Sequence, residues 1–121
     1  MRTSTLDRRR AILRDALTAI FADHGPDVDL DTVARQIGTS RRQLQRVFAE
    51  LSDRSFRDTL AAVRMGRART LLSTTDRRIA DIGREVGYSE PAQFTKAFRH
   101  HHGMTPRDYR RAVSARDGHG S

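Results

Sequence analysis

The sequence predicts an all-α chain of seven helices, and three of its features support this fold class. Apolar residues recur at intervals of three and four, as on one face of a helix, and no segment alternates with the period of two typical of a half-buried strand. Glycine, proline and serine separate these periodic segments. One helical unit also occurs twice, 49 to 50 residues apart, as LDTVARQIGTSRRQLQRVF and IADIGREVGYSEPAQFTKAF.

The first helix is predicted from about residue 5 to residue 23, where Gly25 and Pro26 end it. Its apolar positions share one face, and four arginines lie mostly on the other. A basic amphipathic helix packs on a core or lies on a membrane surface, and the modest apolar face favours core packing. The apolar positions are Leu6, Leu13, Ala16, Leu17, Ile20 and Phe21.

A pair of short helices follows. The first is predicted over Leu30–Ile37 and ends at Gly38, because glycine accepts the positive φ that follows many helix C-termini. Ser40 is the expected N-cap of the next helix, Arg41–Leu51, and Gln43 would complete a capping box.

A long fourth helix is predicted over residues 56–72, and a second short pair follows it. The fifth helix would end near Val86, before Gly87. Ser89 would cap the sixth, which runs to about His101, and the last would begin at residues 105–106.

Two short helices joined by a tight turn that contains glycine form a helix-turn-helix, whose second helix enters the DNA major groove. In the first unit Ala34, Ile37, Leu44 and Phe48 fall where the two helices would touch. Small residues, Ala34 here and Gly83 in the second unit, permit a close crossing. The chain is therefore expected to form two helix-turn-helix subdomains joined by a long linker helix.

The outward face of the third helix carries hydrogen-bond donors and no acidic residue before Glu50. Arg41 suits a phosphate, whereas Arg42, Gln45 and Arg46 suit base edges.

The second unit carries fewer donors and is expected to read bases less strictly. Phe94 and Phe98 turn inward, and Gln93 and Lys96 remain outside. Glu90 either caps the helix or accepts a hydrogen bond from a cytosine amino group, and the capping role is favoured.

The predicted domains place the first helix and first motif at 1–55 and the linker helix at 56–75. The second motif and last helix take 76–113, and 114–121 would form a disordered tail. A spacer of about 17 residues spans roughly 25 Å, so two reading helices would reach major grooves about 34 Å apart. One monomer would then bind both grooves.

Composition favours a polyanionic partner, since Lys and Arg outnumber Asp and Glu by 23 to 15, for a net charge of +8. There is no cysteine, which excludes disulfides, thiolate metal sites and cysteine nucleophiles. No signal peptide and no apolar stretch of about 20 residues is present, so we expect no membrane association and a cytoplasmic protein.

An enzyme is not expected. The chain carries no nucleotide-binding loop, zinc-protease motif or nucleophile elbow. The adjacent residues His100, His101 and His102 point about 100° apart on a helix, so they cannot converge on one ion. We expect a solvated, partly cationic helix end, with no metal and no cofactor.

The run ARTLLSTTDRRIADIGREVGYSEPAQFTKAFRHHHGMTPRDYRR carries the most specific pattern. It has an Ile-x-Asp-Ile start at 79–82, a Gly-aromatic pair at 87–88 and Gly-x-Thr-Pro-x-x-Tyr-Arg at 103–110. It resembles the DNA-binding domain of the AraC/XylS family of bacterial transcription regulators, over about residues 5–112. The resemblance implies a sequence-specific regulator on double-stranded DNA that recruits RNA polymerase, like the family's small activators.

The resemblance also implies roles for individual residues. Arg64 falls on a position that is structural rather than a DNA contact, and Asp53 replaces a usual glycine, at some strain. Base contacts fall on Arg42, Gln45, Arg46, Gln93 and Lys96. Backbone contacts fall on Ser40, Ser55, Ser89, Thr95, Thr105 and Arg107, beside Arg41.

Two alternative functions remain open. The chain could bind nucleic acid without sequence preference, or serve as a protein-interaction module on a helix-turn-helix scaffold. A separate question is whether the chain is a single-domain regulator or a fragment of a larger one; Met1 and the complete first helix favour the former. The expected location is the bacterial nucleoid.

Overall fold

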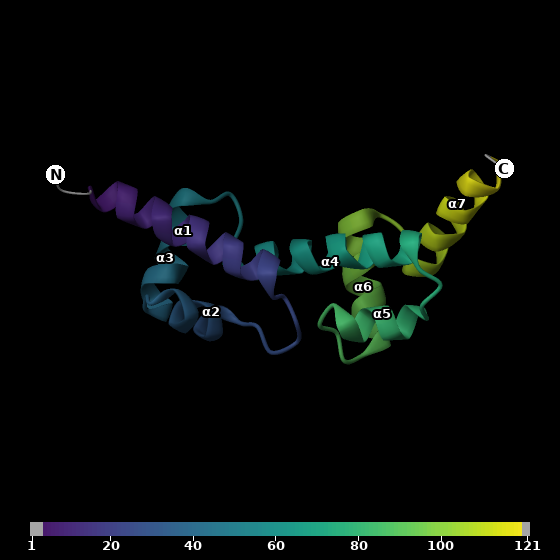
Figure 1. Cartoon of the computed structure of the whole chain (residues 1–121), viewed down its shortest axis with the longest axis horizontal. Helices are drawn as coiled ribbons and strands as arrows, with labels where there is room; N and C mark the ends of the chain where they lie inside the picture. Colours follow the sequence, from purple (N-terminus) through teal and green to yellow (C-terminus); the bar gives the residue numbers. More distant parts are fainter. Residues whose placement is uncertain (1–3, 120–121) are drawn as a thin grey trace. The chain divides into compact units, whose positions relative to one another are not determined.

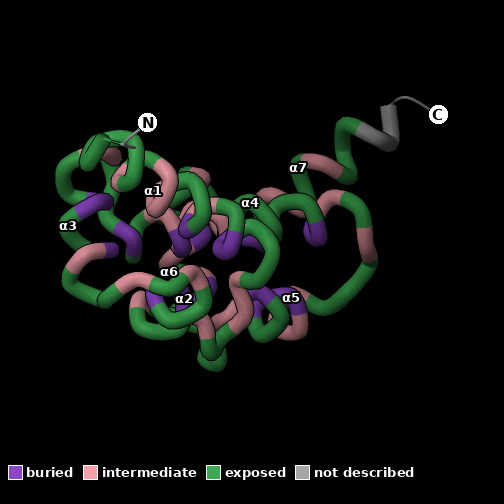
Figure 2. The backbone as a smooth tube through the Cα atoms, turned by 60° about the vertical axis from the view of Figure 1, so that its left-hand side comes forward, coloured by how far each residue is buried: buried purple, intermediate pink, exposed green. Residues whose placement is uncertain are grey.

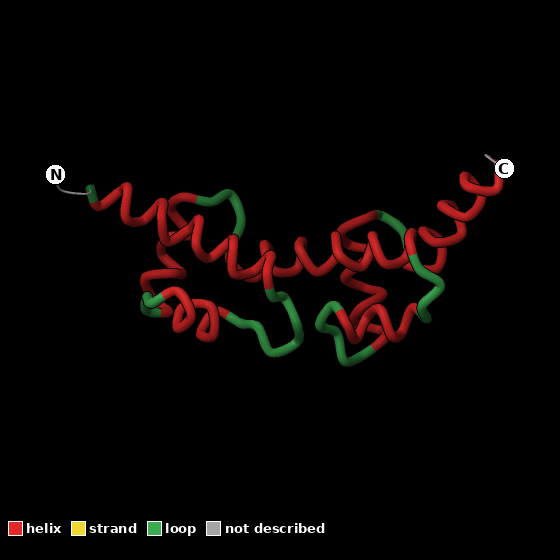
Figure 3. The backbone as a smooth tube through the Cα atoms, in the orientation of Figure 1, coloured by secondary structure: helices red, strands yellow, loops and turns green. Residues whose placement is uncertain are grey.

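The computed structural model describes residues 4–119, which form seven α-helices and no strand (Figures 1 and 3). The predicted fold class is confirmed. The helices are α1 (Thr5–Ala22), α2 (Leu30–Ile37), α3 (Arg41–Leu51), α4 (Phe56–Thr74), α5 (Ile79–Glu85), α6 (Pro91–His102) and α7 (Pro106–His119).

The last helix differs most from its prediction. Helix α7 continues to His119, although the sequence predicted a disordered tail from Ser114. No proline occurs between Ser114 and His119, so every residue there keeps the backbone N–H that the helix needs. Residues 120 and 121 lie outside the described range.

The chain divides into two compact units, residues 1–63 and 64–121. Helix α4 contributes to both, because Phe56 and Leu60 enter the core of the first unit while Met65, Ala68 and Leu72 enter that of the second. The residues predicted as a linker are therefore part of two cores.

In the first unit α1 packs on α2 and α3, and α2 packs on α3. Each of these helices has buried residues, which are purple in Figure 2. Phe48 meets Phe56 edge to face, with ring centroids 5.5 Å apart. The predicted core face of α1 is buried only in part, since Leu6 is 44% and Phe21 65% exposed. The core residues are Ala16, Ala19, Ile20, Val33, Ala34, Leu44, Phe48, Phe56 and Leu60.

In the second unit α6 packs on α5 and α7, around the buried rings of Phe94 and Phe98. A Cβ atom built on Gly83 would lie 2.8 Å from Cδ2 of Phe94, so only glycine fits this crossing of α5 and α6. This agrees with the prediction that a small residue is needed there.

Arg110 joins α7 to the end of α4. Its guanidinium donates to the backbone oxygens of Leu72 and Thr75 at 3.1 Å and of Arg77 at 2.6 Å. It therefore satisfies carbonyls at and beyond a helix C-terminus, which lack intrahelical partners.

Both motif turns depend on a glycine with positive φ, 77° at Gly38 and 106° at Gly87. At Gly87 the Nε atom of Arg64 lies 2.8 Å from where a Cβ would stand, so the Arg64 side chain packs on the turn within its own unit. The expected strain at Asp53 is wrong, because no described residue other than glycine has positive φ.

Candidate nucleic-acid interface

Helix α3 exposes its polar face because the opposite face is anchored in the core. Leu44, Val47 and Phe48 are buried. Ser40 begins the helix as predicted: its hydroxyl oxygen accepts from the backbone N–H of Gln43 at 3.0 Å. Among the described residues, the reciprocal capping box occurs instead before α2, at Asp29 and Thr32.

The three predicted base-contacting residues of α3, Arg42, Gln45 and Arg46, are all exposed. Within residues 4–119 their side chains have no hydrogen bond or ion pair. Two guanidinium groups and an amide are thus available as donors on one helix face. Such groups suit guanine and adenine edges in a major groove.

Arg41 differs from its neighbours because it already has a partner. Its Nη1 lies 3.2 Å from Oδ2 of Asp31 on α2, and both side chains are largely exposed. An exposed pair of this kind contributes about 0–1 kcal/mol, so a phosphate can replace the carboxylate at little cost.

A groove beside α3 brings the start of α4 next to the recognition face. Arg41 and Gln45 line it together with Ser55 and Arg57. The Ser55 hydroxyl oxygen accepts from the backbone N–H of Asp58 at 3.1 Å, and its own proton stays free to donate to a phosphate. Spacing along the sequence gave no sign of Arg57, which lines this groove because the start of α4 lies beside α3.

A second groove places Arg8 of α1 beside Thr39, Ser40 and Gln43, at the turn of the first motif. Arg8 is exposed and has no described side-chain partner. Helical spacing predicts only that Arg8 is one of the four arginines on the outer face of the first helix, and no local signal relates it to a turn thirty residues later.

Helix α6 begins differently from the prediction. Its N-cap is Glu90, not Ser89, and the Glu90 side chain makes no capping hydrogen bond. Pro91 occupies the first helical position, which makes the residue directly before it the cap. The favoured capping role of the Glu90 carboxylate is therefore wrong, and this group lies exposed at the start of the helix.

The remaining predicted residues of the second unit lie on α6 and at the start of α7. Gln93 and Lys96 are exposed, opposite the buried Phe94 and Phe98, whereas Thr95 is half-buried. Thr105 caps α7, since its Oγ1 accepts from the backbone N–H of Asp108 at 3.1 Å. Ser89 and Arg107 are exposed. The predicted residues of the second unit thus lie on α6 and on the segments directly before and after it.

The three adjacent histidines at the end of α6 differ in their exposure, so they do not form the solvated helix end that was expected. His102 is half-buried: its Nε2 lies 3.1 Å from the backbone oxygen of Met65, and its ring is 4.5 Å from that of Phe98. His100 and His101 are exposed. The described residues hold no group of three metal-ligating side chains, and none of their helices has the length and apolar character needed to cross a bilayer.

Comparison with known proteins relates this geometry to one family. A helix-turn-helix domain family matches residues 33–112. Regulatory protein SoxS of Escherichia coli K12 is 32% identical over 99 residues, covering 82% of this chain and 92% of the relative. HTH-type transcriptional regulator ArgR of Pseudomonas aeruginosa is 33% identical over 98 residues, 81% of this chain and 30% of its own length. The Msm operon regulatory protein of Streptococcus mutans is 27% identical over 86% of this chain and 37% of its own length. The chain therefore spans about a third of the length of the latter two.

Solved structures give the same relation. A transcriptional regulator with an AraC-type DNA-binding domain from Chromobacterium violaceum is 31% identical, with a TM-score of 0.80 over 86% of this chain and 93% of its own. The DNA-binding domain of AdpA, a global transcriptional factor solved with a target DNA, is 28% identical, with a TM-score of 0.73 over 89% of this chain and 94% of its own.

Proposed function

Because this chain belongs to the helix-turn-helix family of AraC-type regulators, we infer that it is a sequence-specific DNA-binding regulator of transcription. The observation that carries this is the outer face of α3, where Arg42, Gln45 and Arg46 are exposed with no side-chain partner among the described residues. Unpaired guanidinium and amide donors on a helix anchored by a buried opposite face suit base edges in a major groove.

In this proposal α3 reads one major groove and α6 reads the next, from a single monomer. The duplication of the motif in the sequence supports one recognition helix for each groove. Gln93 and Lys96 are the base-contacting residues of α6, and Glu90, which makes no cap bond, is available to a cytosine amino group. With fewer cationic donors, α6 discriminates bases less strictly than α3.

Phosphate contacts fix the register of the two helices in the same proposal. Arg8 and Arg57 join the predicted set because each lines a groove beside α3 or its turn. The predicted set is Ser40, Arg41, Ser55, Ser89, Thr95, Thr105 and Arg107.

We place the protein on the bacterial nucleoid, where the DNA-bound chain recruits RNA polymerase.

In vitro selection of bound duplexes tests the core of this proposal. Random duplex DNA is enriched with the wild-type chain and with a triple variant, Arg42→Ala, Gln45→Ala, Arg46→Ala. We expect the wild type to enrich one site of about two helical turns and the variant to lose the half read by α3. Failure of the wild type to enrich any sequence, with binding that depends only on salt, would support non-specific binding instead.

A further inference from the structure

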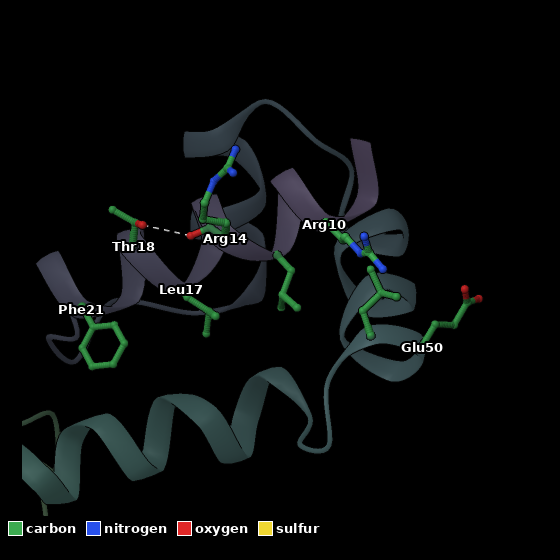
Figure 4. Close-up of a pocket in the computed structure, with 8 residues that line it drawn as sticks. Arg10, Arg14, Leu17, Thr18, Phe21 and Glu50 are labelled. Carbon is green, nitrogen blue, oxygen red and sulfur yellow. Dashed lines mark hydrogen bonds between the residues drawn. The ribbon is translucent and has the colours of Figure 1, made fainter. Parts of the chain in front are cut away.

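One groove of the first unit is lined by none of the residues that we propose as DNA contacts. One stripe of α1, from Arg10 to Phe21, forms most of it, and the end of α3 completes it at Glu50 and Leu51 (Figure 4). We call this the α1 groove. Its α1 residues follow helical spacing over eleven steps, so the stripe is about 16 Å long at 1.5 Å per residue.

The α1 groove has an apolar floor that ends at an exposed aromatic ring. Leu13, Leu17 and Leu51 are half-buried. Phe21 is 65% exposed, the largest exposure among the large apolar side chains of residues 4–119. Leu17 and Phe21 point to the same side of α1 (Figure 4). A large exposed apolar group beside an apolar floor is typical of an interaction surface.

The charges of the α1 groove that have no partner among the described residues are positive. Arg10 and Arg14 are exposed, and neither guanidinium has an ion pair or hydrogen bond within the described part of the chain. The groove's acid, Glu50, is already paired with Arg9, which does not line the groove. Two unpaired cations beside an apolar floor complement a surface that is apolar with acidic flanks.

The α1 groove stays accessible in the DNA complex proposed above. On α3, Leu51 follows Arg42 by nine residues, which at about 100° per residue places it half a turn away from the base-reading face. Glu50, at the rim of the groove, follows Arg46 by four residues and lies nearer to that face. A duplex held by Arg42, Gln45 and Arg46 would therefore leave the apolar floor at Leu51 open, with Glu50 on the side of the DNA.

We propose that the α1 groove binds an acidic amphipathic helix of a partner protein. Apolar side chains at i, i+3 or i+4, and i+7 would pack on Leu13, Leu17 and Phe21, as in other helix-in-groove complexes. Carboxylates beside them would pair with Arg10 and Arg14. A second copy of this chain fits poorly, because a symmetric contact would set these arginines against each other on a chain of net charge +8.

The probe for this proposal is a labelled helical peptide of about 14 residues, with leucine along one face and glutamate on its flanks. Its binding to the full chain is measured by fluorescence anisotropy. We expect Phe21→Ala to weaken binding about tenfold, as truncation of an aromatic anchor does. The double variant Arg10→Ala, Arg14→Ala should weaken it about as much and flatten its salt dependence. Arg67→Ala, Arg69→Ala, which removes two exposed arginines of α4, is the matched control and should change nothing.

A second peptide of the same composition, rearranged so that it has no apolar face, separates docking from charge attraction, and should not bind. Equal binding of both peptides, or equal loss in the control variant, would overturn the proposal. So would self-association of the wild-type chain in sedimentation that Phe21→Ala abolishes, because the occupant would then be a second copy. Duplex binding by Phe21→Ala should stay within about twofold of wild type, so failure here is distinguishable from failure of the DNA-binding proposal.

Discussion

At the scale of the residue, the exposed arginines of the first motif differ in what they already bind. Arg9 is paired with Glu50 and Arg41 with Asp31, whereas Arg42 and Arg46 have no partner among the described residues. Each pair links two helices at the surface, α1 with α3 and α2 with α3, and the unpaired groups carry the base-reading role that we infer.

Replacing Arg46 separates base reading from phosphate binding. Arg46→Ala should weaken binding to the selected site by ~1–3 kcal/mol and relax the preference at one base pair, because a bidentate donor is lost. Binding is measured on the site and on single-base variants. Arg107→Ala should instead weaken binding to all duplexes and reduce the salt slope by about 1. Equal loss on random DNA for Arg46→Ala would show a backbone contact only.

Arg110 is a structural residue of the second unit, because its guanidinium binds three carbonyls of another segment. Arg110→Ala should lower the free energy of unfolding by about 2 kcal/mol, measured in urea by circular dichroism, since hydrogen bonds from a charged group to three carbonyls, two of them half-buried, are lost. Arg110→Lys should recover only part of this, because an ammonium group cannot span all three oxygens. Arg111→Ala, an exposed neighbour, should stay within about 0.5 kcal/mol of wild type.

At the scale of the element, replacing two helical glycines by alanine should have opposite effects on stability. Gly83→Ala should destabilise the second unit by about 1–3 kcal/mol, because the new methyl group would overlap the buried Phe94 ring. Gly66→Ala on α4 should stabilise the chain by about 0.5–1 kcal/mol, since nothing lies within 4 Å and alanine favours the helix. Both effects are measured by thermal unfolding of the variants and the wild type. If Gly83→Ala stabilised the chain, the crossing of α5 and α6 would have space for the methyl group.

The cap of α2 at Asp29 should make the stability of the first unit sensitive to acid. The backbone N–H of Thr32 donates to Oδ1 of Asp29 at 2.8 Å and holds the pKa of this carboxyl below its ordinary value of 3.8. Since the folded pKa is the lower one, the contribution to stability is present above the unfolded pKa and is lost as pH falls through the folded pKa. Asp29→Asn keeps a capping oxygen but cannot titrate.

We therefore expect the unfolding midpoint of Asp29→Asn to fall less steeply than that of wild type below about pH 4. The midpoints are compared in urea from neutral pH downward. Identical acid profiles for the two proteins would mean that the cap does not contribute to the pH dependence.

At the scale of the whole molecule, the duplicated motif predicts how many copies bind one site. Sedimentation of the chain with its selected duplex should give a 1:1 complex, and hydroxyl-radical footprinting should protect about two helical turns. A 2:1 complex would show that one chain reads a single groove and that two copies are needed.

The helices, and the face that each motif exposes, follow from short-range patterns in the sequence. The bounds of α2 and α3 agree with their predictions because glycine turns, capping serines and apolar spacing act within a few residues. Once Leu44 and Phe48 face inward, the helical period places Arg42, Gln45 and Arg46 outside. No tertiary information is needed for that step.

Which distant groups meet depends on the packing of the helices in the folded chain. It placed Arg8 and Arg57 beside α3, paired Arg41 with Asp31, and brought Arg110 to the end of α4. It also left Phe21 exposed, although its spacing predicted burial. These outcomes depend on how helices far apart in the chain pack on one another, and a periodic pattern records which face is apolar but not which neighbour covers it.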